Sequence, residues 1–583
     1  MLYTIIKENT YQDSIVLMLL SNKLSSIDGV NKVSIMMGTP ANKDIFKSSG
    51  LGTDDLEKAK PNDIVIVVDT DDEAKVDEVS HAVDEELKGN AEKDESSSSK
   101  EANNWNKAMD LANNPNLAMI SIPGQYAAME ADNALNNGLH VFMFSDNVAK
   151  EDEVALKQKA HEKGLMVMGP DCGTGIIHSV PLAFTNIVNE GDIGVVGASG
   201  TGIQEVTTII DREGKGVTNA IGTGGRDLST EVGAITMLDS IKALNQDPKV
   251  EVITVISKPP AKEVEDKVLN VLRNIEKPIV TLFLGHKPEY TEANIYHAYT
   301  LEEAARVSVQ LSNKEEPNFT PSVLKDVEVK LDDEQKAIKG YYSGGTLASE
   351  AAMLIKDALN VNSDKAEGFA LKAGDHEVID LGDDMYTQGK PHPMIDPEKR
   401  IEMLETSADQ ASTAVIMIDN VIGYGSHDDM ANELAPTISR IKAKVQEQGR
   451  DIAILATVVG TEHDHQGYEQ QQQTLREAGA IICDTNDQMV RTAIELVGGK
   501  VEQPVLEVKT FEPTKVDLKV DEKIMNLINM KPSVINIGLK SFTEAIEQSC
   551  SEVVQFNWRP IAGGNEKLMK VLQFLNNYEG ESV

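Results

Sequence analysis

A glycine-rich segment, Gly197 to Gly202, stands between a short apolar run and a stretch with helical periodicity. The N–H groups at the start of a helix and the positive end of its dipole bind anions. Glycines in such a loop remove the Cβ atoms that would hold a phosphate away from the backbone. The segment therefore predicts a phosphate-binding loop of Ser199, Gly200, Thr201 and Gly202, the alternative being a tight turn that needs glycine for its own conformation.

A second segment of this kind lies further along the chain, where Ser343, Gly344, Gly345 and Thr346 precede an apolar helix predicted over residues 351–359. We expect the two helix starts, one in each of two lobes, to face one another across a lobe interface. A phosphate held between them needs few lysines, because each helix end acts as roughly half a positive charge. Such a site suits this chain, which has 55 Lys and Arg against 94 Asp and Glu.

The formal net charge of −39 narrows the range of partners. A negative field of this size repels phosphate backbones and anionic lipid surfaces, so neither nucleic acid nor a membrane is expected as a partner. The longest early apolar run, Ile15 to Leu20, is far shorter than the roughly 20 residues of a membrane-spanning helix. Three cysteines far apart in the sequence exclude a disulfide framework. These features predict a cytoplasmic protein that binds a small anion in a local pocket.

The order of predicted elements indicates an α/β protein made of several doubly wound parallel-sheet lobes. Apolar strands alternate with helices over most of the chain, which implies parallel sheets with both faces covered. The strands with the clearest pattern are Val30–Met37, Ala118–Ile122, His140–Phe144, Ile193–Val196, Val252–Ile256, Ile279–Leu284, Ala414–Ile418 and Ile452–Thr457. Because the pattern recurs along the chain, we expect duplicated α/β lobes.

Several of these motifs resemble a known family. The first glycine-rich segment, with Gly169–Ile176 before it and Glu205 after it, resembles the succinyl-CoA synthetase α-subunit. The second helix start, with the strand Val415–Asp419, resembles the carboxyl-terminal domain of the β-subunit. The fused order of these parts, with the string Asp380–Asp396, is similar to the FdrA family, and the resemblance covers about residues 1–565.

The element pattern and the resemblance together divide the chain. Residues 1–88 are predicted to form a small α/β unit of ferredoxin-like type, residues 106–190 a CoA-binding-like Rossmann half, and residues 191–312 and 335–500 two flavodoxin-like lobes similar to the synthetase α and β ligase domains. Residues 89–105 and 313–334 are predicted linkers, and residues 501–583 a C-terminal extension with a small α/β element. No ATP-grasp domain and no first CoA-binding βαβ unit are recognised.

The resemblance implies a subunit of oxamate carbamoyltransferase, which acts with companion subunits in allantoin breakdown and converts oxalurate and phosphate to oxamate and carbamoyl phosphate. In the synthetases two facing helices hold the phosphate carried by a histidine, and Glu205 matches the carboxylate that orients this histidine. The Gly-His-Ala-Gly context of the histidine is missing here. His297 lies near the expected offset but precedes a helix cap, whereas His286, at the carboxyl end of a strand, is a candidate for substrate contact.

Two other functions stay open. One is an NDP-forming acyl-CoA synthetase, which would form phosphohistidine and bind an acyl-CoA. The other is a non-catalytic scaffold or regulatory subunit. CoA or Mg²⁺ is implied as a cofactor only by the ligase alternative, and no set of metal ligands is predicted.

A few further residues are candidates for contact with the substrate. Arg226, after a glycine-rich turn, is a possible clamp for a carboxylate or phosphate, or else a surface arginine. A Gly- and Pro-rich loop after a strand carries polar candidates that position substrate, bind Mg²⁺ or are simply solvated: Asp380, Asp383, Asp384, His392 and Asp396. Cys172 is a candidate nucleophile, although a buried small residue is the commoner role of a cysteine in such a loop.

Overall fold

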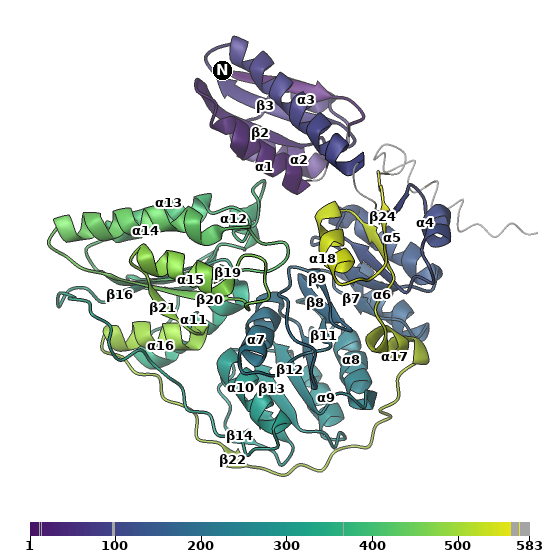
Figure 1. The fold of residues 1–583 in the computed structure, drawn as a ribbon, viewed down its shortest axis with the longest axis vertical. Coiled ribbons are helices and arrows are strands. Elements are labelled where there is room, and N and C mark those ends of the chain that lie inside the picture. Colours follow the sequence, from purple (N-terminus) through teal and green to yellow (C-terminus); the bar gives the residue numbers. More distant parts are fainter. Residues whose placement is uncertain (11, 13, 96–99, 365, 561–570, 572–583) are drawn as a thin grey trace, which may run out of the picture. The chain divides into compact units, whose positions relative to one another are not determined.

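The computed structural model describes the chain except for residues 11, 13, 96–99, 365, 561–570 and 572–583. The chain falls into two compact units, whose elements are labelled in Figure 1. One unit consists of Met1–Ala108, Thr387–Pro391 and Gln555–Val583, and the other of Met109–Tyr386 and His392–Val554.

The N-terminal unit is built on a three-stranded antiparallel sheet with helices on both faces. The strand order is β1 (Leu2–Lys7), β3 (Ile64–Thr70) and β2 (Val30–Met37). Apolar side chains of α1 (Ser14–Ser25) and α3 (Ala74–Glu95) pack on one face, and those of α2 (Pro40–Ser48) and the 3-10 helix η1 (Asp54–Lys58) pack on the other. Since β1 and β2 are parallel and flank β3, they form a split βαβ unit.

The first lobe, residues 174–312, contains a seven-stranded sheet in the order β15-β13-β12-β10-β11-β8-β9. The five strands from β15 to β11 are parallel to one another. The hairpin of β8 and β9 extends the sheet beyond β11, and β8 pairs with β11 in the antiparallel direction. The strands are β8 (Thr174–Ile177), β9 (Val180–Ala183), β10 (Ile193–Gly197), β11 (Ala220–Gly222), β12 (Val252–Ser257), β13 (Ile279–Phe283) and β15 (Ile295–His297). The helices are α7 (Gly200–Arg212), α8 (Ile235–Gln246), α9 (Lys262–Leu272) and α10 (Leu301–Ser312).

The second lobe, residues 335–500, contains a six-stranded sheet in the order β17-β18-β16-β19-β20-β21, in which β17 is antiparallel to the rest. The strands are β16 (Ala337–Tyr342), β17 (Phe369–Ala373), β18 (His376–Asp380), β19 (Thr413–Val421), β20 (Ala453–Val459) and β21 (Ile481–Cys483). The helices are α11 (Gly345–Leu359), α12 (Asp384–Thr387), α13 (Glu398–Ala408), α14 (Met430–Glu447), α15 (Tyr468–Glu477) and α16 (Asn486–Leu496).

Both lobes have the strand order of flavodoxin-like folds. When the parallel strands of each lobe are numbered along the chain, each sheet has the order 2-1-3-4-5. In each lobe the order reverses beside the first strand, which is β10 in one and β16 in the other, and the loop after that strand begins α7 or α11. Ligands of open α/β sheets bind at this reversal point. The predicted α/β class, with doubly wound parallel lobes, is confirmed.

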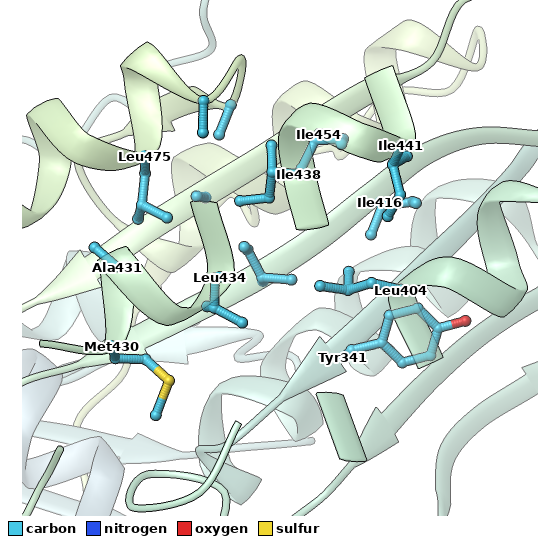
Figure 2. Close-up of a cluster of buried hydrophobic side chains, with 14 of the residues drawn as sticks. Tyr341, Leu404, Ile416, Met430, Ala431, Leu434, Ile438, Ile441, Ile454 and Leu475 are labelled. Carbon is cyan, nitrogen blue, oxygen red and sulfur yellow. The ribbon is translucent and has the colours of Figure 1, made fainter. Parts of the chain in front are cut away.

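Apolar side chains of three helices cover one face of the second lobe's sheet (Figure 2). Leu404 of α13, Leu434 of α14 and Leu475 of α15 pack on the side that carries Ile416 of β19 and Ile454 of β20, and all five are buried. Burying one such side chain contributes about 1.5–3 kcal/mol. This layer therefore fixes the sheet whose strands β16 and β19 carry the second helix start.

A third sheet combines segments from the middle and the end of the chain. β5 (Leu117–Ile120), β6 (His140–Met143) and β7 (Val167–Met168) are parallel, and β23 (Val534–Ile537) pairs with β5 in the same direction. β24 (Val553–Phe556) lies beyond β23. The associated helices are α5 (Gly124–Asn136), α6 (Lys150–Glu162), α17 (Glu522–Asn529), η2 (Lys540–Phe542) and α18 (Thr543–Gln548). Strands β23 and β24 of the predicted C-terminal extension thus enlarge the sheet of β5, β6 and β7.

The connecting segments differ from one another. The predicted linker 89–105 contains the end of α3, the short strand β4 (Lys100–Ala102) and the first residue of α4 (Trp105–Leu111). Residues 313–334 form neither helix nor strand. Residues 499–521 are extended, and within them β22 (Glu507–Val508) pairs with β14 (Tyr290–Thr291). Among the described residues no helix has the length and apolar character needed to cross a bilayer.

Candidate functional site

The helix start in the first lobe has free N–H donors. Ser199 caps α7, and its Oγ accepts the N–H of Gly202 at 3.1 Å. Gly200 and Thr201 are half-buried, and within the described part of the chain no acceptor receives their N–H groups. A Cβ at Gly200 would lie 3.3 Å from Thr174 Oγ1. Glycine therefore leaves the space between the helix start and Thr174 unfilled. The α7 start can therefore donate hydrogen bonds to an anion.

The helix start in the second lobe already holds a carboxylate of the protein. Asp419, buried in β19, accepts the N–H groups of Ser343 and Gly344 at 2.8 Å each and the Ser343 hydroxyl at 3.0 Å. Buried Arg400 lies 3.4 Å from Asp419, and burial lowers the pKa of this guanidinium. One residue further on, Gly345 is half-buried, and its N–H has no acceptor among the described residues.

The two helix starts meet each other. Ser199 Oγ and Thr346 Oγ1 are 2.6 Å apart, and the N–H of Thr346 donates to Thr201 Oγ1 at 3.3 Å. A Cβ at Gly344 would lie 3.1 Å from Thr201 Cβ, and one at Gly202 would lie 3.2 Å from Thr346 Cγ2. The structure thus brings together the two glycine-rich segments that the sequence marks as candidate phosphate loops.

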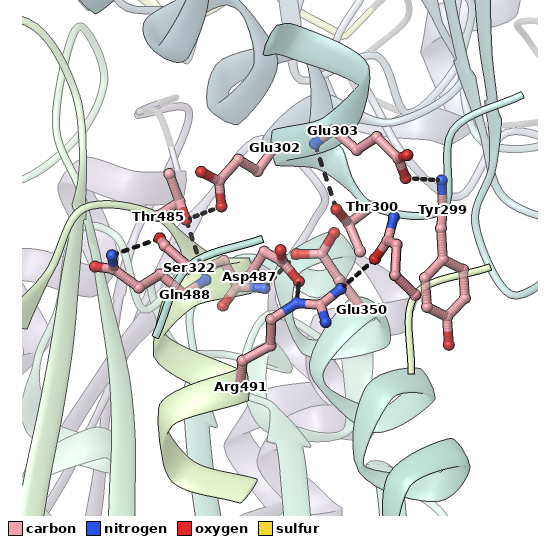
Figure 3. Close-up of polar contacts among 12 residues, drawn as sticks. Tyr299, Thr300, Glu302, Glu303, Ser322, Glu350, Thr485, Asp487, Gln488 and Arg491 are labelled. Carbon is pink, nitrogen blue, oxygen red and sulfur yellow. Dashed lines mark hydrogen bonds and ion pairs between the residues drawn. The ribbon is translucent and has the colours of Figure 1, made fainter. Parts of the chain in front are cut away.

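Polar side chains from both lobes are buried behind the helix starts (Figure 3). Glu302 of α10 accepts the hydroxyl of Thr485 at 2.7 Å, and Asp487 of α16 accepts Arg491 Nε at 2.8 Å. Glu350 of α11 accepts the N–H that begins α10, at 2.7 Å. Helices α10, α11 and α16 are therefore joined by carboxylates in an interior where charge is costly.

Glu205 of α7 belongs to this buried group. It is 1% exposed, its Oε1 accepts the N–H of Asn486 at 3.0 Å, and its Oε2 has no hydrogen-bond partner among the described residues. Burial raises the pKa of Glu205 to about 7, and it also raises the pKa values of Glu350 and Asp487. Glu205 therefore exchanges a proton near neutral pH. No described histidine contacts it, in contrast to the role that the synthetase resemblance implies.

One cation beside the helix starts was missed by the sequence analysis. Lys258 directly follows β12, which pairs with β10, so Lys258 and the loop of Ser199 leave the sheet at the same edge. Lys258 is exposed, and its ammonium forms no hydrogen bond or ion pair within the described chain. It favours the charged forms of Asp171 and Asp380, although burial raises the pKa of Asp380 to about 6. The sequence marks Lys258 only by its position directly after an apolar strand.

Arg226 is bound by other residues of the chain and is not free to clamp a ligand. Its Nε lies 2.8 Å from Glu153, and its Nη2 donates to the carbonyl of Val148 at 2.9 Å. Glu153 is buried and also pairs with Lys157 at 3.0 Å. The guanidinium therefore compensates a buried carboxylate and has little capacity left for substrate.

The polar candidates at the end of β18 and in the loop after it differ in their surroundings. Asp383 and Asp384 are exposed. His392 accepts the N–H of Met394 at 3.2 Å, and burial, aided by Arg400, lowers its pKa to about 4. Asp380 instead lies against the α11 start, because a Cβ at Gly345 would collide with its Oδ2. This proximity follows from the parallel pairing of β18 with β16, in which Asp380 lies opposite Tyr342.

The two candidate histidines line a different cavity of the first lobe. His297 is buried, with Nδ1 2.6 Å from Thr281 Oγ1 and Nε2 3.4 Å from Glu292 Oε1, so both ring nitrogens are engaged. His286 is exposed and lies 3.8 Å from Glu265. Neither histidine contacts the helix starts or Glu205 among the described residues.

Other candidate chemistry is limited by burial and by geometry. Cys172 is buried, and burial raises its pKa to about 12, so the reactive thiolate form is disfavoured. Among the described residues, no group of three His, Cys, Asp or Glu side chains is arranged to hold a metal ion.

The chain matches three protein-family descriptions. "CoA binding domain" matches residues 188–285 and "CoA-ligase" matches residues 341–496. "AllF, heavy metal-associated domain" matches residues 1–104. These matches and the paired flavodoxin-like lobes define a CoA-ligase-like protein, although the CoA-binding match falls on the first lobe rather than on residues 106–190. All three cysteines lie beyond residue 104, so the N-terminal domain has no thiolate to offer a soft metal.

One relative is close over most of its length. The uncharacterized protein YahF of Escherichia coli (strain K12) is 42% identical over 500 residues, which cover 83% of this chain and 96% of YahF. The chain therefore belongs to the YahF family.

Solved structures with similar parts are more distant. The dinucleotide forming acetyl-coenzyme A synthetase 1 of Ca. Korarchaeum cryptofilum is 14% identical, with 66% of this chain and 83% of that chain covered and a TM-score of 0.28. The ATP citrate lyase from Methanothrix soehngenii, in complex with citrate and coenzyme A, is 13% identical, with 66% and 82% covered and a TM-score of 0.30.

Proposed function

We propose that this chain is the phosphate-binding subunit of a carbamoyltransferase of the FdrA type, which acts with companion subunits on oxalurate and phosphate. The observation that carries the proposal is the meeting of two helix starts at which Gly200, Thr201 and Gly345 keep half-buried, unpaired N–H groups. Such donors bind a phosphate dianion without lysine. A free phosphate, rather than a phosphohistidine, fits a site that no described histidine contacts.

The proposed reaction transfers the carbamoyl group from nitrogen to oxygen. An oxygen of HPO₄²⁻ attacks the terminal ureido carbon of oxalurate, and the bond from this carbon to the inner nitrogen breaks. The proton of HPO₄²⁻ ends on that nitrogen, which leaves as the amide of oxamate, while the new C–O bond gives carbamoyl phosphate. No oxidant or nucleotide enters the balance. The site has to place two anions together, which costs Coulomb energy unless local donors offset it.

Two side chains have properties that suit this task. Lys258, exposed and unpaired within the described chain, supplies a permanent charge for the oxalurate carboxylate. Asp380 lies against the α11 start, and its pKa of about 6 lets it carry a proton to the leaving nitrogen near neutral pH. In this proposal Asp380 is the general acid, whereas Glu205 positions α16 through the N–H of Asn486.

The acyl-CoA ligase alternative has its own support in the CoA-binding and CoA-ligase matches. It requires a histidine that can be phosphorylated at the helix starts. His297, whose two ring nitrogens are engaged by Thr281 and Glu292, is poorly suited to that role. The two functions are therefore separated by the presence or absence of a phosphorylated histidine.

A direct assay tests the proposal. The purified chain is mixed with the proteins encoded beside it, and carbamoyl phosphate formed from oxalurate and phosphate is measured. Activity is expected for the parent and for Gly52→Ala, whose new Cβ makes only an ordinary 3.4 Å contact, and it is expected to be lost in Gly200→Val. Formation of an acyl-CoA with an acid-labile phosphate on His297 would replace the proposal by the ligase alternative.

A further inference from the structure

The first lobe contains a cavity to which the proposed function gives no role. It has a volume of about 230 Å³ and is lined by residues of α9, β13, β15 and the loop between β13 and β14. None of its lining residues belongs to the two glycine-rich segments. It therefore requires an explanation independent of the phosphate site.

A glycine creates the loop that closes one side of the cavity. Gly285 has φ +100°, a conformation that other residues rarely adopt, and a Cβ there would also lie 3.0 Å from Pro259 Cγ. After this turn, His286, Lys287 and Glu289 form part of the cavity wall and are exposed. The loop therefore places charged side chains at the rim.

The floor of the cavity has no free polar group. Leu269, Phe283 and Ala298 are buried apolar residues. Thr281 and His297 also line the cavity, but their hydroxyl and imidazole bond each other at 2.6 Å. The part of a ligand that reaches the floor must consequently be apolar, because a polar group there would lose its hydrogen bonds with water.

The rim carries free charges of both signs. Lys287 has no hydrogen bond or ion pair in the described chain, its ammonium lying over the ring of Tyr299 at 5.4 Å. Glu289 likewise has no partner there, and it does not pair with Lys287. Glu265, on the α9 side, is not free, because it lies 3.8 Å from His286 and 3.4 Å from Lys262. A ligand that carries one positive and one negative group can satisfy this rim, whereas a phosphate would face two carboxylates.

We propose that this cavity binds a free aliphatic α-amino acid. Its ammonium would lie with Glu289 and Glu265, its carboxylate with Lys287 and His286, and its side chain on the floor of Leu269, Phe283 and Ala298. The volume agrees, because about 230 Å³ equals roughly eight waters at ~30 Å³ each, the size of valine rather than of a nucleotide. Cavities for drug-sized ligands start at about 300 Å³.

Calorimetric titration of the full chain with L-valine tests the proposal. Isovalerate and isobutylamine serve as probes that carry the same hydrocarbon with only one of the two charges. Valine is expected to bind with a dissociation constant of about 1 mM or lower, and each probe at least about tenfold more weakly. No heat from valine at about 20 mM, or equal binding of isovalerate, would overturn the proposal.

Rim variants give the second measurement without disturbing the buried floor. Lys287→Met and Glu289→Gln are each expected to weaken valine binding about tenfold. Glu263→Gln, an equally exposed change on α9 that does not line the cavity, is the matched control and is expected to leave binding unchanged. Ala298→Leu, which fills the floor, should abolish binding. Unchanged affinity in both rim variants would show that valine binds elsewhere and would reject the site.

Discussion

The two flavodoxin-like lobes have the same topology but treat their key helix starts differently. In the first lobe a serine hydroxyl caps α7 and leaves the N–H groups of Gly200 and Thr201 unpaired. In the second lobe the carboxylate of Asp419 occupies the α11 start and is itself compensated by Arg400. The same fold position thus keeps free N–H donors in one lobe and holds an internal carboxylate in the other.

This difference teaches that a glycine-rich helix start is not by itself a free anion site. The partial positive charge of a helix start is satisfied by whatever anion the structure holds nearest to it. Asp419 is fixed at 0% exposure within a nine-residue strand, so it cannot leave to make room for a ligand. The α7 start should therefore supply most of the affinity for phosphate, and the α11 start most of the rigidity.

The largest expected effect is the loss of the internal carboxylate. Asp419→Ala removes the carboxylate that compensates buried Arg400, which keeps only backbone carbonyls such as that of Pro393 as acceptors. It also leaves two buried N–H groups without an acceptor, and the change is expected to cost about 3–5 kcal/mol of unfolding free energy. Urea unfolding followed by circular dichroism measures this change. The control is Asp409→Ala, which removes an ion pair with Lys444 that is about half exposed on both sides. Similar unfolding midpoints for the two variants would show that Asp419 does not stabilise the second lobe more than an exposed ion pair does.

The next effect concerns the proton on Glu205. Its folded pKa of about 7 lies above the ordinary 4.5, so its contribution to stability is full at low pH and is lost as the pH rises through about 7. The loss amounts to about 3 kcal/mol of unfolding free energy as the pH rises from about 4.5 to about 7. Glu205→Gln, which stays neutral, should lose less melting temperature between pH 5.5 and pH 8.5 than the parent. Glu190→Gln, an exposed change, should keep the parent's slope, and equal slopes for all three proteins would contradict the assignment.

The asymmetry between the helix starts predicts unequal effects on phosphate. Gly200→Val should weaken phosphate binding at least about tenfold, or ~1.4 kcal/mol, because its side chain covers free N–H groups. Gly344→Val should have a smaller effect, since Asp419 already takes the Gly344 N–H. Phosphorus NMR titration compares the two after circular dichroism has shown that both are folded. A greater loss in Gly344→Val would reverse the roles of the lobes.

The smallest expected effect separates two cations. Lys258→Met should weaken oxalurate binding about fivefold, or ~1 kcal/mol, since it removes an unpaired charge. Arg226→Lys should leave the affinity within about twofold, because the arginine is already bound to Glu153. Calorimetry with oxalurate measures both. A stronger effect of the arginine variant would restore Arg226 as the substrate clamp.

Much of the fold could be predicted because its signals are local. Both glycine-rich segments follow apolar strands and start helices, and the order 2-1-3-4-5 follows from repeated strand and helix units. Asp419 could not be assigned, since it ends an apolar run and nothing in the sequence states that its side chain turns toward Gly344. Lys258 was missed for the same reason: the pairing of β12 with β10 gives it its place, not a motif.

His286 is the opposite case, in which the sequence pattern predicts a substrate contact and the structure places the residue at a cavity lined by neither helix start. His286 does lie near the carboxyl end of β13, but that strand is two places from β10 in the sheet, and the residue faces the amino-acid-sized cavity. Helix α2 has a local sequence signal directly after the predicted strand Val30–Met37: Pro40 is its first residue, and Thr39 Oγ1 caps it by accepting the N–H of Asn42 at 3.3 Å.

The pairing of β23 with β5 has a consequence for synthesis on the ribosome. Val534 pairs with Leu117, so β5 waits for a partner 417 residues later in the chain (534 − 117). At roughly 5–20 residues per second, translation takes about 20 to 80 s to supply it. During that time β5, whose four residues are all buried in the finished protein, has an open edge that can pair with a neighbouring nascent chain. Chaperone capture of the unfinished polypeptide would therefore matter more for this protein than its final stability suggests.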